Sequence, residues 1–178
     1  DSESHGVQAV FQCGFNGCKS YFVGYFLAGP GGLRLAQVKP QTVETSSIPE
    51  IVQKLSPTFI EVYREAEAAK SHGLNQIAGP GYRKAFEFLI KDYAISKNPD
   101  DKERIEKSFS GNVVKEFIED IRIQKVAKRV LWLGNDESHY LKKWVNHNTE
   151  DLIILIRLAI GWIEIEQLSN TYEVDMPE

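Results

Sequence analysis

Residues 82–93, YRKAFEFLIKDY, carry the clearest helical pattern in this chain. Their apolar side chains recur at i, i+3, i+4, i+7, i+8 and i+11, a spacing that places them on one face of an α-helix. These side chains are Tyr82, Ala85, Phe86, Leu89, Ile90 and Tyr93. Arg83 and Glu87 stand four residues apart on another face, where opposite charges can pair. The segment therefore predicts an amphipathic helix that buries one face against neighbouring helices.

Start and stop signals predict further helices on the N-terminal side of this segment. Ser47-Ile48-Pro49-Glu50 is typical of a capping box, and Ser56-Pro57 indicates a second helix start. His72-Gly73 predicts the end of that second helix. Gly79-Pro80 predicts the start of the helix that contains residues 82–93. The pattern is therefore helical from residue 47 onward.

The helical pattern continues toward the C-terminus. A long helix follows Ser110-Gly111 and is expected to end at Gly134, because glycine is favoured just beyond a helix. Either residue of Asn135-Asp136 is expected to cap a short helix that runs through Trp144. Asn148 caps the last helix, which is apolar on nearly all sides. We expect that helix to lie centrally or at a subunit interface.

Residues 7–38 instead read as strands. The β-prone runs Val7–Phe11, Ser20–Phe26 and Leu33–Val38 are separated by glycine-rich turns. They predict a three-stranded antiparallel ribbon. The predicted fold class is therefore α+β, with residues 1–45 as the ribbon, 46–172 as an antiparallel helical domain and 173–178 as an acidic tail.

Cys13 and Cys18 lie in the first turn of the predicted ribbon, at a spacing that suits one half of a zinc knuckle. Structural zinc needs four ligands. His5 is a candidate third. Because the only methionine is Met176, further sequence is expected ahead of Asp1, and a second cysteine pair there would complete the site. Two unligated thiols, or a disulfide across the turn, are the alternatives, and disulfides are rare in reducing compartments. Zinc is the only cofactor that the sequence indicates.

The composition favours a globular, cytoplasmic protein. Of the 178 residues, 42% are hydrophobic, which is enough to build a core. No apolar run reaches the roughly 18 residues that cross a bilayer, so no membrane association is expected. The first five residues carry no basic region or apolar stretch of the kind found in signal peptides.

The formal charge of −4 is unevenly distributed. Between Asn148 and Glu178 one arginine faces seven acids, a net charge of −6. Between Arg122 and Lys143 six bases face two acids, a net charge of +4. The basic stretch can hold a phosphate-bearing ligand, although such a stretch is more often a solvated helix face. The overall acidity argues against indiscriminate binding to nucleic acid.

Two motifs in this order resemble a known family. They are residues 82–93 and Trp132–Tyr140, WLGNDESHY, followed by the helix that contains Trp162-Ile163-Glu164. This part of the chain, about residues 46–168, looks like the bacterial domain-of-unknown-function family 4145, in which a cysteine-bearing ribbon in front is also typical. That family is usually placed in the HEPN superfamily (higher eukaryotes and prokaryotes nucleotide-binding). The resemblance implies an up-and-down helical bundle that often dimerises.

The resemblance also implies what the site residues do. HEPN ribonucleases share an arginine followed after four to six residues by a histidine; the arginine stabilises phosphate charge and the histidine moves a proton. His139 stands in the histidine position, but the arginine positions are Trp132, Leu133 and Gly134, none of which is basic. Arg129 stands further upstream, and Lys143 lies at i+4 from His139. The candidate catalytic group is therefore His139, Arg129 and Lys143, without the usual arginine.

The candidate binding residues surround the same motifs: Asn135, Asp136, Glu137, Tyr140 and Arg83. In the structural alternative, Asn135 and Asp136 are helix caps, His139 bonds to a neighbouring helix, and Trp132, Tyr140 and Trp144 belong to the core. A metal site at Asp136, Glu137 and His139 is a weaker hypothesis, because consecutive helical residues point in different directions. His147 carries no signal of its own.

Two functions follow from these residues. The first is a non-catalytic interaction or nucleotide- or nucleic-acid-sensing module of a bacterial HEPN-like protein, acting as a homodimer and contacting RNA, a nucleotide or a protein partner. The second is a divergent, metal-independent HEPN-type ribonuclease that uses His139 in phage defence or as a toxin. The missing arginine favours the first, and the basic residues around His139 keep the second open.

Overall fold

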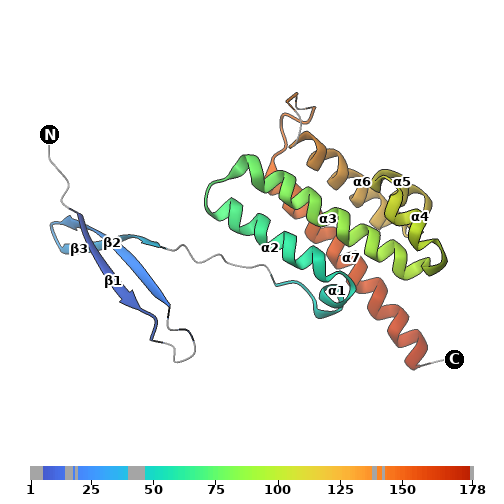
Figure 1. Cartoon of the computed structure of the whole chain (residues 1–178), viewed down its shortest axis with the longest axis horizontal. Helices are drawn as coiled ribbons and strands as arrows, with labels where there is room; N and C mark the ends of the chain where they lie inside the picture. The colour runs from blue at the N-terminus through green and yellow to red at the C-terminus, as the bar shows by residue number, and fades with distance from the viewer. Residues whose placement is uncertain are drawn as a thin grey trace. The chain divides into compact units, whose positions relative to one another are not determined.

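The computed structural model describes residues 6–14, 18, 20–39, 47–137, 140–141 and 143–176. The chain divides into two compact units, Asp1–Glu44 and Thr45–Glu178 (Figure 1). The first contains a three-stranded antiparallel sheet and the second is helical. The fold class is therefore α+β, as the sequence predicts.

The sheet consists of β1 (Gly6–Gln12), β2 (Tyr21–Gly29) and β3 (Gly32–Lys39) in the order β1-β2-β3, which confirms the predicted meander. Phe11 pairs with Phe22 across β1 and β2, and their rings stack with centroids 5.2 Å apart. A Cβ atom on the neighbouring Gly24 would lie 2.8 Å from the Phe26 ring. Glycine at residue 24 therefore makes room for the phenylalanines on that face.

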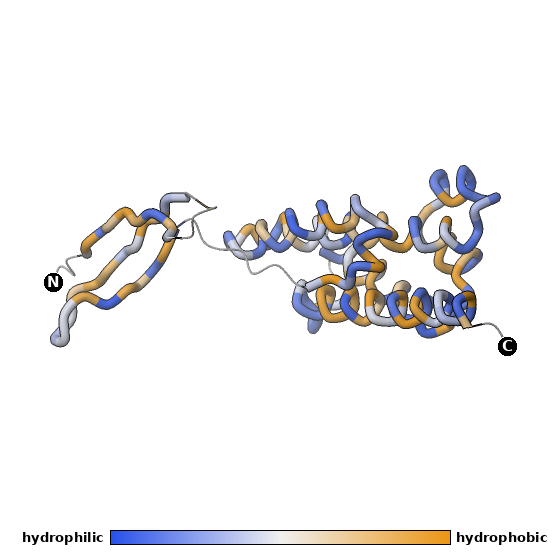
Figure 2. Tube along the Cα trace, turned by 90° about the horizontal axis from the view of Figure 1, so that it is seen from below, coloured by the Kyte–Doolittle hydropathy of each residue, from blue (hydrophilic) through white to orange (hydrophobic). Residues whose placement is uncertain are grey.

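The helical unit is built around α3, which contacts α2, α5, α6 and α7 (Figure 1). All six apolar residues predicted for its buried face are at most 2% exposed. The apolar and polar positions that alternate along the helices are visible in Figure 2. The helical elements are α1 (Glu50–Leu55), α2 (Pro57–Ser71), α3 (Asn75–Lys97), a short 3-10 turn (Pro99–Asp101), α4 (Lys102–Lys107), α5 (Ser110–Glu116), α6 (Ile121–Asp136) and α7 (Thr149–Asp175).

The predicted helix starts near residues 47 and 79 are wrong. α1 begins at Glu50 with Pro49 at its N-cap, and within residues 47–55 no side chain caps it, so there is no capping box. α3 begins at Asn75, which leaves Pro80 inside the helix. Ser56 does precede α2, but its hydroxyl donates to Asp92 of α3 at 2.5 Å instead of capping α2. That bond ties the start of α2 to α3.

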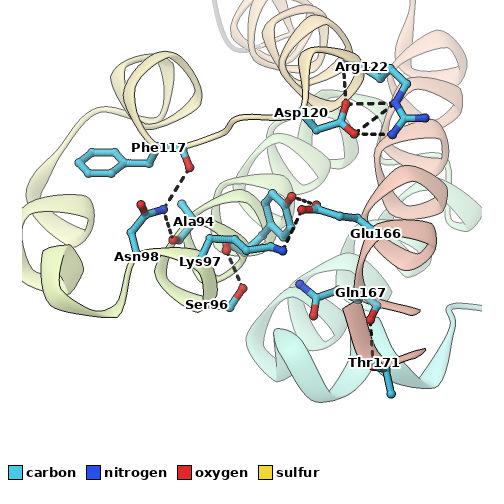
Figure 3. A network of polar contacts seen from close by, with 11 residues as sticks. Ala94, Ser96, Lys97, Asn98, Phe117, Asp120, Arg122, Glu166, Gln167 and Thr171 are labelled. Carbon is cyan, nitrogen blue, oxygen red and sulfur yellow. Dashed lines mark hydrogen bonds and ion pairs between the residues drawn. The ribbon is translucent and has the colours of Figure 1, made fainter. Parts of the chain in front are cut away.

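The single long helix predicted after Ser110-Gly111 is two helices, because the chain breaks between Phe117 and Asp120. The Asp120 carboxylate accepts hydrogen bonds from the backbone N–H groups of Arg122 at 2.7 Å and Ile123 at 3.3 Å, which starts α6. The Asn98 side chain donates to the Phe117 carbonyl at 3.1 Å (Figure 3). Side-chain hydrogen bonds therefore replace the backbone ladder at the break.

α7 begins as predicted at Asn148, in a capping box with Asp151. One side of α7 is buried against the other helices, and near its C-terminal end Glu166 pairs with Lys97 at 2.8 Å and accepts a hydrogen bond from Tyr93 (Figure 3). Burial raises the pKa of the Glu166 carboxyl. The helix continues to Asp175, so residues 173–175, expected in an acidic tail, form its last turn.

Candidate functional site

Arg83 of α3 packs directly on Gly134 of α6. A Cβ atom on Gly134 would lie 2.6 Å from Arg83 Cδ, so only glycine leaves space for the arginine stem. Beyond this contact, Arg83 Nε donates to Asn135 Oδ1 at 3.2 Å and Nη1 donates to Glu87 Oε2 at 3.2 Å. The predicted pairing of Arg83 with Glu87 is therefore confirmed, and the structure adds the contact of Arg83 with Gly134 and Asn135 in the second motif.

Gly134 does not end α6, contrary to the sequence-based expectation, because the helix continues to Asp136. The glycine serves the close approach of Arg83 and not a left-handed helix end. A glycine required for close packing and a glycine required at a helix end look the same in the sequence. The two cannot be told apart without knowing which side chain lies opposite.

Arg83 lies in the wall of a hollow of about 470 Å³ between α3, α5 and α6, which we call the cationic hollow. Lys115 of α5 and Lys128 of α6 also line it, and Glu87 is the one acid among its lining residues in the described part of the chain. Neither lysine forms an ion pair with a described residue, whereas Glu87 is shared by Arg83 and Lys91. The hollow therefore carries an excess of positive charge.

The lining of the cationic hollow also contains the Glu87 carboxylate and the buried Ser110 hydroxyl. Burial favours the neutral form of Glu87, but Lys91 and Arg83 outweigh it and hold the pKa of the carboxyl below its ordinary value. Ser110 is only 3% exposed, and its hydroxyl has no hydrogen-bond partner among the described residues. A buried polar group without a partner costs stability, so its presence in the wall indicates an available donor for a ligand.

Asp136 and Glu137 hold the segment that follows α6 in place. Asp136 Oδ2 accepts hydrogen bonds from the backbone N–H groups of Lys143, at 2.7 Å, and Trp144. Glu137 packs on Gly79 of α3, whose Cβ position would lie 2.7 Å from Glu137 Cβ, and accepts a hydrogen bond from Thr149 at 3.3 Å. The expected short helix through Trp144 is wrong for the described residues 140–141 and 143–148, which form bends and turns.

A second hollow, of about 430 Å³, also has Trp132 among its lining residues. We call it the aromatic hollow, because Trp132 of α6 and Trp144 stack in its wall with centroids 6.4 Å apart and ring planes 13° apart. The His147 ring meets Trp144 edge-on with centroids 6.4 Å apart. Trp132 is 52% exposed and Trp144 38% exposed, so neither is a core residue, contrary to the structural alternative.

Two of the three candidate catalytic residues, Arg129 and Lys143, lie at the aromatic hollow. Arg129 lines this hollow, whereas Arg83, a candidate binding residue, lines the cationic hollow. The side-chain nitrogen of Lys143 lies 5.7 Å from the centre of the Trp144 ring, and Tyr140 is fully exposed. His139 lies outside the described residues.

The sequence reasoning missed Lys115, Lys128, Ser110 and His147, which line the two hollows from separate segments. Only the basic stretch that contains Lys128 was a signal, and it did not indicate which face of α6 is used. Because the helix break at residues 117–120 was not predicted, the side on which α5 presents Lys115 could not be inferred. The pairing of Trp132 with Trp144 depends on Asp136, which was taken for a helix cap.

Cys13 and Cys18, the two candidate zinc ligands, are free thiols; Cys13 is half-buried and Cys18 is exposed. Hydrogen bonds from the Ser20 side chain and backbone, and from Cys13, hold the pKa of the Cys18 thiol below its ordinary value, which favours the thiolate that binds metals. Within the described ranges, no group of three or more histidine, cysteine or acidic side chains is placed to hold a metal ion. His5, the candidate third ligand, lies outside those ranges.

Comparisons of the chain with protein-family models, with curated proteins and with solved structures give no match. The resemblance to family 4145 therefore rests on the quoted motifs alone. Among the helices in the described part of the chain, none combines the length and the apolar character needed to cross a bilayer.

Gly134→Ala tests the contact between α3 and α6. The added methyl group must displace the Arg83 stem, so we expect the free energy of unfolding to fall by about 1–3 kcal/mol. Gly111→Ala is the matched control, because a Cβ atom at this glycine of α5 meets nothing within 4 Å. The control should raise the stability by up to about 1 kcal/mol. Urea unfolding of both variants measures the difference; equal effects would show that the Arg83 contact is not tight.

Proposed function

We propose that the helical unit is a non-catalytic binding module of a HEPN-like protein, and that it holds a phosphate-bearing ligand, a nucleotide or nucleic acid, in the cationic hollow. The observation that carries the proposal is the convergence of Arg83, Lys115 and Lys128, from three helices, on one hollow with a single acid. The chain as a whole carries a net charge of −4, so this local excess of positive charge is specific to the hollow.

The arginine is prepared for such a ligand before binding. Glu87 and Asn135 hold the guanidinium from two sides, and the side chain is only 19% exposed. An arginine held in one orientation loses less freedom when it binds a phosphate in its planar fork of donors. Ser110 adds a buried hydroxyl that can donate to a phosphate oxygen. A mobile surface lysine cluster would have neither feature.

The proposed module is non-catalytic because the groups near the cationic hollow have binding or structural roles. In the described part of the chain, no histidine lines this hollow. Asp136 and Glu137, which can accept protons, hold backbone N–H groups and the Thr149 hydroxyl instead. Binding therefore needs fewer assumptions than acid–base catalysis does.

We also propose that the module acts as a homodimer through α7. Its exposed side carries Ile154, Leu158, Ile165, Leu168 and Tyr172, which are 42–62% exposed. Their spacing of three, four or seven residues, with Gly161 open at the centre, forms the seam of a helix pair.

Charge reversal tests the proposed phosphate site. Lys115→Glu and Lys128→Glu should each weaken the binding of inorganic triphosphate about tenfold or more, because each removes a charge-assisted hydrogen bond and adds repulsion. Lys125→Glu is the control, since Lys125 lies on α6 outside the lining residues of the hollow. Calorimetry at low salt gives the affinities. An equal loss in all three variants would indicate diffuse attraction and contradict the site.

The alternative, a metal-independent ribonuclease centred on His139, makes a different prediction. Wild type incubated with labelled total RNA and a chelator should then yield defined fragments that His139→Ala does not yield. Our proposal expects identical fragment patterns from the two proteins over time. Fragments from the wild type alone would overturn the non-catalytic module, while the affinities of the lysine variants would still report on the phosphate site.

Leu158→Glu tests the dimer. A charge at the centre of the exposed side of α7 should convert a dimer into a monomer in sedimentation velocity at micromolar concentration, because a buried carboxylate without a partner is costly. Ile77→Glu, at a residue that is 63% exposed on α3, should leave the dimer intact. A monomeric wild type under these conditions would refute the proposed pairing.

A further inference from the structure

The stacked tryptophans of the aromatic hollow are held in an exposed position by the fold. Trp132 projects from α6, and Trp144 is brought against it because Asp136 accepts the backbone N–H groups of Lys143 and Trp144. Their ring planes lie within 13° of each other. Trp132 remains 52% exposed and Trp144 38% exposed, so part of each apolar ring is in contact with water. Exposed apolar surfaces on a fixed scaffold commonly mark binding sites.

The rim of the aromatic hollow offers polar groups at its edge. His147 Nδ1 lies 3.3 Å from Asp151 Oδ2, and the same carboxylate accepts the Asn148 N–H at 3.1 Å. The Asp151 carboxylate is thus engaged within the protein. Two lining groups can bond to the edge of a planar ligand: the imidazole of His147 and the guanidinium of Arg129 on α6.

The charge around the tryptophans selects against a cationic ligand. Arg129 lines the hollow, and the side-chain nitrogen of Lys143 lies 5.7 Å from the centre of the Trp144 ring. A quaternary ammonium or a methylated lysine, which aromatic faces otherwise attract, would meet these two positive charges. A flat, neutral ring attached to an anion meets one acid in this lining, Asp151, whose carboxylate is already bonded to His147 and to the Asn148 N–H. Nucleotides combine those two properties.

The two hollows share a wall, since Trp132 lines both. The aromatic hollow has a volume of about 430 Å³ and the cationic hollow a volume of about 470 Å³. Each has a volume typical of small-ligand sites. Proteins that bind single strands combine aromatic platforms for the bases with positive grooves for the phosphates.

We propose that the aromatic hollow is a base subsite, in which an unpaired nucleobase stacks on the Trp132–Trp144 pair. The ligand class is then a nucleotide, free or within a single strand, and not a phosphate-bearing molecule of any kind or a base-paired duplex. The inference that the phosphate lies in the cationic hollow rests on the proposed function, whereas the inference that the base stacks on the tryptophans does not. A paired base is not available to the tryptophans, because both of its faces are covered in the duplex.

Trp144→Leu is the variant that tests the subsite, with adenosine, adenosine monophosphate, an oligoadenylate single strand and inorganic triphosphate as probes. Trp144 is partly exposed and outside the helices, so the variant should fold; Trp144→Phe, which keeps an aromatic ring, should restore binding of the bases. Trp162→Phe is the control, because Trp162 lies away from the hollow under the Arg122 guanidinium, 4.4 Å from its ring centre. Fluorescence and calorimetry report the affinities.

We expect adenosine and adenosine monophosphate to quench the tryptophan fluorescence of the wild type. Trp144→Leu should lower their affinities at least about fivefold, the loss expected of one stacking contact, and leave the triphosphate affinity unchanged. If oligoadenylate binds more tightly than adenosine monophosphate, the result supports a single strand as the ligand. Equal affinities of the two would support a free nucleotide.

Equal affinities of wild type and Trp144→Leu for adenosine monophosphate, or no binding of adenosine and its monophosphate at all, would overturn the base subsite. Triphosphate binding lost in Lys128→Glu would still support the proposed function in that case. Adenosine that binds to a protein without affinity for triphosphate would support the base subsite and contradict the phosphate site. The two proposals therefore fail separately.

Discussion

The close crossing of α3 and α6 at Gly134 is the contact on which the rest of the candidate site depends. Arg83 passes over the glycine backbone, and one α3 turn earlier Gly79 receives the Glu137 side chain. In one contact the glycine belongs to α6 and the long side chain to α3. In the other the glycine belongs to α3 and the long side chain, that of Glu137, follows α6. The two contacts fix the C-terminal end of α6 against α3, and from that end Asp136 determines where Trp144 lies.

The crossing also explains why both hollows lie beside one residue. α6 presents Lys128 toward α3 and α5 and presents Arg129 toward α7, while Trp132, one turn later, lines both sides. A helix held by a glycine contact at its end cannot rotate without displacing Arg83. The arrangement of positive charge on one side and stacked rings on the other is therefore a fixed property of the bundle, and the proposed nucleotide ligand matches it.

Local patterns predicted much of the fold. The buried face of residues 82–93, the three-strand meander and the Asn148 cap follow from periodicity and short-range chemistry, and the structure has all three. The break at Asp120 was missed because the apolar spacing continues across it, whereas the start of α6 depends on the carboxylate of a single residue, Asp120.

Gly134 and Asp136 were misjudged because the groups that they contact cannot be inferred from the local sequence. Arg83, which packs on Gly134, is distant in the chain, and the Trp144 N–H group, which bonds to Asp136, lies outside the helices. Arg83 and Asn135 were predicted as binding residues from the motifs, whereas Lys115 and Ser110 belong to the site only through tertiary packing.

The central claim is that Arg83, held by Gly134, Glu87 and Asn135, is the phosphate-binding group of the cationic hollow. The most direct measurement is the nuclear magnetic resonance signal of the Arg83 Nε–H group, assigned with Arg83→Lys, during titration with inorganic triphosphate. We expect a signal that is already sharp in the free protein, and that shifts and saturates with the affinity measured by calorimetry. A signal that stays unchanged while those of exposed lysines elsewhere shift would contradict the central claim.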